Sequence, residues 1–171
     1  MSWCRWGLND GVDLLNALST EEAERRLYTC FANRAWAARV AAGRPYHDLS
    51  ALLASAESAW TELLPSDWLA SFAAHPRIGE SGGHAPAVSE REQSQIRWAA
   101  GDTLAALAAE NRLYEDRFGH VFLISASGRS ADEMLEELRR RMLNDPATEL
   151  QVAAGEQRKI ARLRLEQMLK T

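Results

Sequence analysis

Signals for helix starts recur along this chain, and they constrain its fold more than any other feature of the sequence. A serine followed three residues later by glutamate is the capping-box pattern, and it occurs at residues 19–22, 89–92 and 130–133. Asp48 is a further candidate N-cap. Apolar residues at helical spacing follow each of these starts. The sequence therefore predicts a protein built almost entirely of helices.

Glycine and proline divide these helices in the first part of the chain. One helix is expected over residues 20–31 and a second over 34–42, where Gly43 supplies the residue favoured just after a helix end. A third helix starts after Asp48 and is expected to end at Pro65. Its apolar residues form one stripe: Leu49, Leu52, Leu53, Ala56, Trp60, Leu63 and Leu64.

The helical pattern then breaks. A short helix is expected to turn Trp68, Leu69 and Phe72 inward and to end at His75, because the following proline disfavours helical backbone. Residues 75–89 contain glycines, prolines and no apolar periodicity. Loops of this length without structure of their own are uncommon and usually functional. This loop is the first place to expect a site.

Three more helices and one extended segment are expected in the rest of the chain. A long helix opens at Ser89, with an inward side formed by Ile96, Ala99, Ala100, Thr103, Leu104 and Leu107. Residues 118–126 are aromatic and β-branched, which is typical of extended backbone. One such segment cannot form a sheet, so we expect a buried extended stretch. The last two helices start at Ser130 and Thr148.

These elements predict an all-α, single-domain bundle of about eight helices with one short extended segment, covering residues 1–171. Residues 1–8 lack helical periodicity and are expected to be irregular. The composition, 46% hydrophobic and 26% charged, is that of an ordinary globular domain, which excludes a disordered or fibrous chain.

The net charge and the cysteine content limit the kinds of partner and the cellular compartment that can be expected. A net charge of −4 argues against a nucleic-acid partner, because neutralising phosphates needs a basic surface. The arginine run at 139–141 is offset by nearby glutamates and is expected to be a solvated helix face. No apolar stretch approaches the roughly 18 residues of a membrane span, so no membrane partner is expected. Cys4 and Cys30 show no metal-ligand spacing, which favours a reducing, cytoplasmic setting.

Two residues that flank the glycine-rich loop could carry catalysis. His75 has the side chain best suited to proton transfer at neutral pH, but a histidine at such a junction could also be a capping or an exposed group. Glu92 could simply complete the capping box of Ser89. The same helix start offers N–H donors to an anionic substrate, which would make Ser89, Glu92 and Gln93 polar contacts.

Other site chemistries find less support. His75, His84 and Glu92 fall within one stretch, but their spacing matches no zinc motif, so no metal is expected. The nucleophile motif Gly-x-Ser-x-Gly is absent, and residues 79–83 lack the lysine of a phosphate-binding loop. Arg164 could pair with a carboxylate, or its planar fork could bind two oxygens of a ligand.

Four short motifs follow one another along the chain. They are residues 75–79 (HPRIG), 89–93 (SEREQ), 111–119 (NRLYEDRFG) and 159–165 (KIARLRL). Together they resemble the OHCU decarboxylases of urate degradation, in full the 2-oxo-4-hydroxy-4-carboxy-5-ureidoimidazoline decarboxylases. The similarity extends from about residue 14 to about residue 169.

The resemblance implies an all-helical homodimer that uses no cofactor and converts the small molecule OHCU to (S)-allantoin with loss of carbon dioxide. It implies catalytic roles for His75 and Glu92. It further implies a set of substrate-binding residues: Pro76, Ser89, Gln93, Phe118, Gly119, Val121, Phe122, Ile124 and Arg164. His120 departs from the family's pattern, in which an apolar residue often follows Phe-Gly.

Two other functions stay open beside this enzyme. One is a non-catalytic binding protein for a ureide or purine ligand, and the other is a helical bundle that binds protein partners. The intact pair His75 and Glu92 favours the enzyme. Ligand affinity without product would favour the binding protein, and no ureide affinity at all would favour the interaction bundle.

Overall fold

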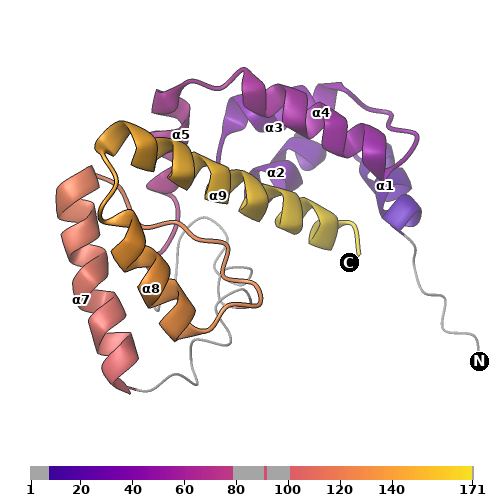
Figure 1. The fold of residues 1–171 in the computed structure, drawn as a ribbon. Helices are drawn as coiled ribbons and strands as arrows, with labels where there is room; N and C mark the ends of the chain where they lie inside the picture. The colour runs from indigo at the N-terminus through magenta and orange to yellow at the C-terminus, as the bar shows by residue number, and fades with distance from the viewer. Residues whose placement is uncertain (1–7, 79–90, 92–100, 171) are drawn as a thin grey trace, which may run out of the picture. The chain divides into compact units, whose positions relative to one another are not determined.

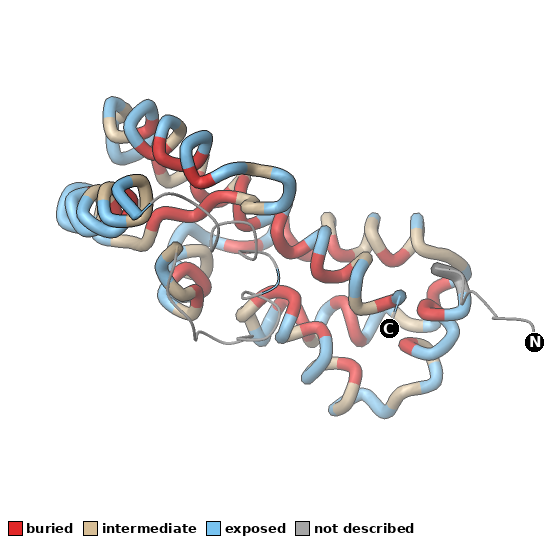
Figure 2. Tube along the Cα trace, turned by 90° about the horizontal axis from the view of Figure 1, so that it is seen from below, coloured by how far each residue is buried: buried red, intermediate tan, exposed pale blue. Residues whose placement is uncertain are grey.

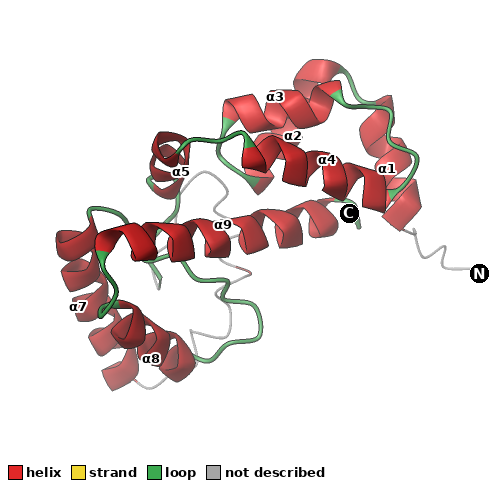
Figure 3. Ribbon diagram, turned by 45° about the horizontal axis from the view of Figure 1, so that its top comes forward, coloured by secondary structure: helices red, strands yellow, loops and turns green. Residues whose placement is uncertain are grey.

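The computed structural model describes residues 8–78, 91 and 101–170 (Figure 1). These residues form eight helices and contain no strand, as the sequence predicts (Figure 3). The chain divides into two compact units. Unit 1 combines Met1–Asp67 with Ile160–Thr171, and unit 2 is Trp68–Lys159. The single domain over residues 1–171 stays a prediction.

Unit 1 is a set of short helices. It contains α1 (Leu8–Ala17), α2 (Thr20–Cys30), α3 (Arg34–Ala42), α4 (Leu49–Thr61) and the end of α9 (Pro146–Met168). Helix α2 packs on α3, and α4 packs on both α3 and α1. Helix α1 is not predicted from the sequence, whereas the predicted starts of α2, α3 and α4 are correct.

Side-chain caps explain these starts. The Ser19 hydroxyl accepts a hydrogen bond from the Glu22 N–H (3.2 Å), and Asp48 Oδ1 accepts one from the Ala51 N–H (2.8 Å). Each cap satisfies one of the N–H groups that a helix start leaves unpaired. The predicted starts of α2 and α4 are therefore confirmed at the level of the capping residue.

Aromatic side chains fill the interior of unit 1. The Phe31 ring lies 5.5 Å from the Trp36 ring and 4.9 Å from the Trp60 ring, measured between centroids. The Trp36 indole also donates to the Ala56 carbonyl (3.0 Å), which ties α3 to α4. In Figure 2 the buried residues of these helices lie on their inner faces.

The predicted end of the third helix is wrong. Helix α4 stops at Thr61, and Pro65 instead opens α5 (Pro65–Phe72), where a missing N–H costs nothing. Asp67 Oδ2 accepts from the Leu64 N–H (2.8 Å) at this new start. Leu64 is consequently exposed and lies outside the apolar stripe, and Leu69 is likewise exposed rather than turned inward.

Unit 2 contains most of α5, α7 (Gly101–Phe118), α8 (Ala131–Arg141) and the first part of α9. Helices α7 and α8 lie side by side (Figure 1). Ser130 and Glu133 form a complete capping box at α8. The expected start of the long helix at Ser89 lies outside the described residues.

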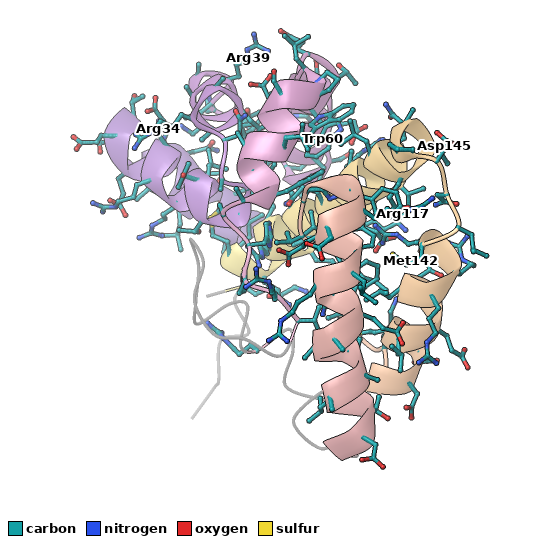
Figure 4. The ribbon with its side chains drawn as sticks, turned by 90° about the vertical axis from the view of Figure 1, so that its left-hand side faces the viewer. Arg34, Arg39, Trp60, Arg117, Met142 and Asp145 are labelled. Carbon is teal, nitrogen blue, oxygen red and sulfur yellow. The ribbon has the colours of Figure 1, made fainter. Side chains whose placement is uncertain are left out.

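Helix α9 begins earlier than predicted. Asp145 Oδ1 accepts from the N–H groups of Ala147 (3.1 Å) and Thr148 (3.0 Å), so α9 starts at Pro146 rather than at Thr148. In Figure 4, Arg117 of α7 points toward the turn between α8 and α9, where Asp145 lies. Its guanidinium donates to the Asn144 carbonyl (3.1 Å), which fixes this turn to α7.

An extended segment, residues 119–126, leaves the end of α7 and crosses unit 2. The extended segment is predicted to begin at residue 118, but Phe118 is the last residue of α7, so the segment begins one position later. Gly119 turns the chain with a φ of 76°, a conformation that favours glycine. The next part of the segment, residues 122–124, is buried. The prediction of a buried extended stretch is therefore confirmed.

This segment joins the interior of unit 2. The buried members of the core cluster are Leu107, Tyr114, Phe122, Ile124, Ala131, Met134, Leu135 and Leu138. Ile78 packs against the same cluster. Among the described residues, none of the helices is long and apolar enough to cross a membrane.

Candidate active site

His75 lies three residues after the end of α5, at the junction where the sequence predicts it. Its backbone N–H donates to the Phe72 carbonyl (3.0 Å), which closes a turn directly after the helix. Only 8% of the residue is exposed. Pro76 follows with its side chain half-buried, and its ring cannot continue the helix. The residue is thus buried instead of being a solvated junction residue.

An ion pair fixes the chain just beyond His75. Arg77 Nε lies 2.5 Å from Glu115 Oε1, and Arg77 Nη2 lies 2.9 Å from Glu115 Oε2. Two parallel bonds of this kind define orientation as well as distance. Glu115 belongs to α7, so the segment that carries His75 is fastened to the helix that leads into residues 119–126.

Residues on both sides of His75 reach the same region of unit 2. The Phe72 ring lies 5.3 Å from the His120 ring. Ile78 packs against the core cluster that contains Phe122 and Ile124. Phe72 before His75 and Ile78 after it therefore both contact the extended segment or the core cluster that includes it.

His120 belongs to an aromatic group around Tyr114. The Tyr114 ring lies 4.8 Å from the Phe118 ring, 5.5 Å from the His120 ring and 5.2 Å from the Phe122 ring. His120 Nδ1 lies 3.1 Å from the Val121 carbonyl oxygen. His120, where the family often has an apolar residue, therefore packs its flat ring among aromatic neighbours.

The backbone of residues 122–124 is buried and yet has unused hydrogen-bonding groups. Among the described residues, none accepts a hydrogen bond from the N–H of Phe122, Leu123 or Ile124. Buried N–H groups in proteins are nearly always paired. Unpaired buried donors on the same unit as His75 are typical of a surface that binds a polar ligand. Phe118 and Val121 beside them are half-buried, and Gly119 is exposed.

Arg141 holds this segment from behind. Its Nη1 donates to the Leu123 carbonyl (2.6 Å), and its guanidinium carbon lies 4.5 Å from the centre of the Phe122 ring. Glu149 Oε1 accepts from Arg141 Nε (2.8 Å) and Nη2 (2.6 Å). Neither side chain is exposed to solvent. Removing one member of such a buried pair costs about 3–5 kcal/mol, because the other charge is left buried alone.

Two more polar groups complete the Arg141 cluster, which consists of Arg141, Glu149, Tyr114 and Asn144. The Tyr114 hydroxyl donates to Glu149 Oε1, and Asn144 Nδ2 donates to Glu149 Oε2 (2.7 Å). Burial raises the pKa of the Tyr114 hydroxyl far above its ordinary value, although Arg141 opposes this shift. The hydroxyl therefore stays protonated and remains a donor to Glu149.

The expected solvated arginine run is right for Arg139 and Arg140 and wrong for Arg141. The first two are exposed and pair with Glu110 and Glu137, whereas Arg141 is fully buried. The burial of Arg141 could have been predicted from helical spacing. Arg141 follows Leu138 by three positions and Met134 by seven, so it shares their inward face.

Two buried side-chain amides are further residues that sequence reasoning misses. Asn111 of α7 is 2% exposed, and its Nδ2 has no hydrogen-bond partner among the described residues. Gln157 of α9 is fully buried, and neither its Nε2 nor its Oε1 has a partner in the same part of the chain. Leaving such groups unpaired is costly in a protein interior. Both are candidate contacts for a polar ligand.

The remaining predicted site residues are distributed over other parts of the chain. Ser89, Glu92 and Gln93 lie outside the described residues. Arg164 is buried on α9 in unit 1, whereas His75 belongs to unit 2, and each is described within its own unit. In the part of the chain that the structure describes, no group of three or more His, Cys, Asp or Glu side chains could hold a metal ion.

Comparisons with known proteins agree on one family. A family model described as OHCU decarboxylase matches residues 16–166. The uric acid degradation bifunctional protein TTL of Arabidopsis thaliana is 32% identical over 159 residues, which cover 88% of this chain and 48% of that protein. This chain therefore spans about half the length of the plant relative.

Two further proteins match over most of their own length. The 2-oxo-4-hydroxy-4-carboxy-5-ureidoimidazoline decarboxylase of Amia calva is 34% identical over 143 residues, which cover 78% of this chain and 79% of that protein. A crystal structure of OHCU decarboxylase in the presence of (S)-allantoin is 32% identical, with a TM-score of 0.77. The match covers 86% of this chain and 99% of that one. The chain therefore belongs to the OHCU decarboxylase family.

Proposed function

We propose that this protein decarboxylates OHCU and releases (S)-allantoin. The observation that carries the proposal is the set of unpaired backbone N–H groups at residues 122–124, buried in the same unit as His75. A substrate rich in carbonyl and ring nitrogen acceptors can accept hydrogen bonds from such donors. Family membership and the similarity to a structure obtained in the presence of (S)-allantoin support the same conclusion.

The reaction needs charge stabilisation and proton transfer. The bond between the ring carbon C4 and the carboxylate breaks, carbon dioxide leaves, and the electron pair moves onto the nitrogen of the neighbouring C=N bond, which takes up a proton. The 4-hydroxyl then loses its proton to become the carbonyl of allantoin, and the carbon that bears the ureido group gains one on a single face. Donors aimed at atoms that become more negative strengthen as the reaction proceeds, which is the differential binding that catalysis requires.

These needs divide the site into two ends. His75 and Glu92 act on the end that bears the hydroxyl and the carboxylate, where imidazole and carboxylate can pass protons. Arg164 and Gln93 hold the ring and the ureido group. The backbone donors at residues 122–124 bind ring oxygen or nitrogen atoms, with Phe118, Gly119 and Val121 beside them and Pro76 and Ser89 completing the contacts. No cofactor takes part in this scheme.

Assembly and location belong to the same proposal. We propose a homodimer, as in the family, that works in the cytoplasm. The sequence observation that supports a reducing setting is that Cys4 and Cys30 show no metal-ligand spacing. Light scattering on the purified protein would give a dimer mass, and a monomer at micromolar concentration would contradict the assembly without touching the chemistry.

The decisive experiment follows the handedness of the product. OHCU is generated in place from urate by urate oxidase and hydroxyisourate hydrolase, and allantoin is followed by circular dichroism. Wild-type protein is expected to accelerate the appearance of the (S) enantiomer, and His75→Asn is expected to abolish that acceleration. His47→Asn is the matched control, because the His47 side chain is 80% exposed.

The outcomes separate the competing functions. Slow racemic allantoin that wild-type protein leaves unchanged would overturn the enzyme. In that case allantoin affinity measured by calorimetry would favour a ureide-binding protein, whereas no affinity would favour an interaction bundle. Full activity of His75→Asn would remove His75 from the mechanism while leaving the family's reaction in place.

A further inference from the structure

Among the residues that the structure describes, no strand lies beside the extended segment to define its position. In the described part of the chain, its backbone is held from other elements by two side chains. Arg141 Nη1 donates to the Leu123 carbonyl (2.6 Å), and Glu156 Oε2 accepts from the Ser125 N–H (2.8 Å). Arg141 also covers the Phe122 ring. Of the two, Arg141 is the side chain that bonds within residues 122–124.

The Leu123 carbonyl and the Ile124 N–H belong to the same peptide unit. Because that unit is planar and trans, its carbonyl and N–H point in opposite directions. Fixing the carbonyl on Arg141 therefore fixes the direction of the Ile124 N–H, which points away from the guanidinium. This N–H has no partner among the described residues, so its direction is free to serve a ligand.

Arg141 is itself held without freedom to rotate. Glu149 Oε1 accepts from two different guanidinium nitrogens, and Tyr114 and Asn144 bind the same carboxylate. The planar guanidinium fork passes this restraint on to the Leu123 carbonyl. The chain of contacts runs from the start of α9 through the end of α8 to the extended segment, entirely within unit 2.

We propose that Arg141 is a positioning residue for substrate binding: held by Glu149, it aims the Ile124 N–H at bound OHCU. The inference rests on the proposed function and deepens it. It assigns a role in ligand orientation to a buried ion pair that touches no substrate atom itself.

The test variant is Arg141→Lys, which keeps the positive charge and removes the planar fork. We assign to the Ile124 N–H a ring atom whose charge changes little in the reaction, and a donor that binds substrate and transition state alike affects KM more than kcat. We expect KM for OHCU to rise about tenfold, with kcat changed by less than about threefold. A loosened ring orientation is also expected to lower the enantiomeric excess of (S)-allantoin.

The matched control is Arg140→Lys. Arg140 is the preceding residue on α8, it is exposed, and its Nε pairs with Glu137 Oε2 (2.8 Å) instead of with the extended segment. The control is expected to keep the wild-type KM, kcat and enantiomeric excess. Hydrogen exchange gives a direct readout, because the amides of residues 122–124 should exchange faster in Arg141→Lys than in Arg140→Lys.

Glu149→Gln serves as the second variant, because glutamine keeps an acceptor for the guanidinium and removes the charge that orients it. It should shift KM in the same direction, and it decides the question if Arg141→Lys is unfolded at the assay temperature. A folded variant with a lower Tm but an unchanged KM and enantiomeric excess would overturn the proposal and leave Arg141 a structural role only. Wild-type protein without catalysed (S)-allantoin formation would overturn the proposed function, and this inference with it.

Discussion

At the scale of single residues, two similar ion pairs on α7 allow position to be separated from stability. Arg77 pairs with Glu115 near His75, and Arg139 pairs with Glu110, which lies five residues earlier on the same helix. Both pairs are partly exposed, and pairs of that kind contribute little to stability. What distinguishes them is that Arg77 lies two residues from His75.

We therefore expect Arg77→Gln to lower kcat for OHCU by about tenfold, because a misplaced catalytic group loses much of its effect. Arg139→Gln should leave kcat unchanged. Melting temperatures measured alongside the kinetics should fall by similar small amounts for both variants. Equal kinetics for the two variants would mean that the ion pair at Glu115 does not position His75.

His75 and Arg141 show which site residues can be predicted from the sequence and which cannot. His75 is predicted from its junction with Pro76, and the structure confirms the junction while adding that the residue is buried. Arg141 is missed because a run of three arginines beside glutamates is typical of a solvated face. Its burial depends on Glu149, which comes from another helix, and no local pattern contains that partner.

At the scale of elements, helix starts follow the sequence more closely than helix ends. Ser19, Asp48 and Ser130 each cap a helix by a bond to a residue three positions later, so the signal is local. The end of α4 is not local in this way. Pro65 marks the next start, and the chain leaves the helix at Thr61 before any proline requires it.

The N-cap of α9 predicts a specific dependence of stability on pH. Hydrogen bonds from Thr148, first from its hydroxyl and then from its N–H, hold the pKa of Asp145 below its ordinary value of 3.8. A carboxylate with a lowered folded-state pKa stabilises the fold above its unfolded-state pKa. That contribution is lost as the pH falls through the lower folded-state value.

Asp145→Asn keeps a capping oxygen but cannot ionise. The wild-type protein is expected to melt at a higher temperature than this variant near pH 6, and the difference should shrink as the pH falls below about 4. Thermal unfolding followed by circular dichroism across this range checks the prediction. A difference that stays constant with pH would show that the charge of Asp145 does not support α9.

At the scale of the whole molecule, two glycines distinguish tight packing from open space. A Cβ atom at Gly11 would lie within 2.8 Å of three backbone atoms of Leu169, whereas one at Gly155 would have no atom within 4 Å. Gly11→Ala is expected to destabilise the protein by about 1–3 kcal/mol through overpacking. Gly155→Ala lies inside α9 and is expected to stabilise it by about 0.5–1 kcal/mol.

Urea unfolding of both variants and the wild type measures the free energy of unfolding, which is expected to fall for Gly11→Ala and to rise for Gly155→Ala. If Gly11→Ala were neutral, α1 and the residues after α9 would not be in close contact in solution. Because Gly11 and Leu169 both belong to unit 1, the measurement tests the packing of that unit alone.

The all-α class, the starts of α2, α3, α4 and α8 and the buried extended stretch follow from periodicity and capping, and the structure confirms them. Three features do not follow. The division into units depends on which distant segments meet, the Arg141 cluster depends on three separate elements, and the unpaired donors at residues 122–124 depend on what fails to pair with them. None of these leaves a mark in a short window of sequence.

Because unit 1 is made of two separate chain segments, the two units are completed in a fixed order during synthesis. Ribosomes deliver Met1–Asp67 first, but Ile160–Thr171 arrives only after the whole of Trp68–Lys159 has been made. The helices of unit 1 must therefore wait for their last segment, and unit 2 is the first body whose residues are all present. A nascent chain stopped near residue 160 would hold a complete unit 2 beside an unfinished unit 1, and it would be a natural client for chaperones.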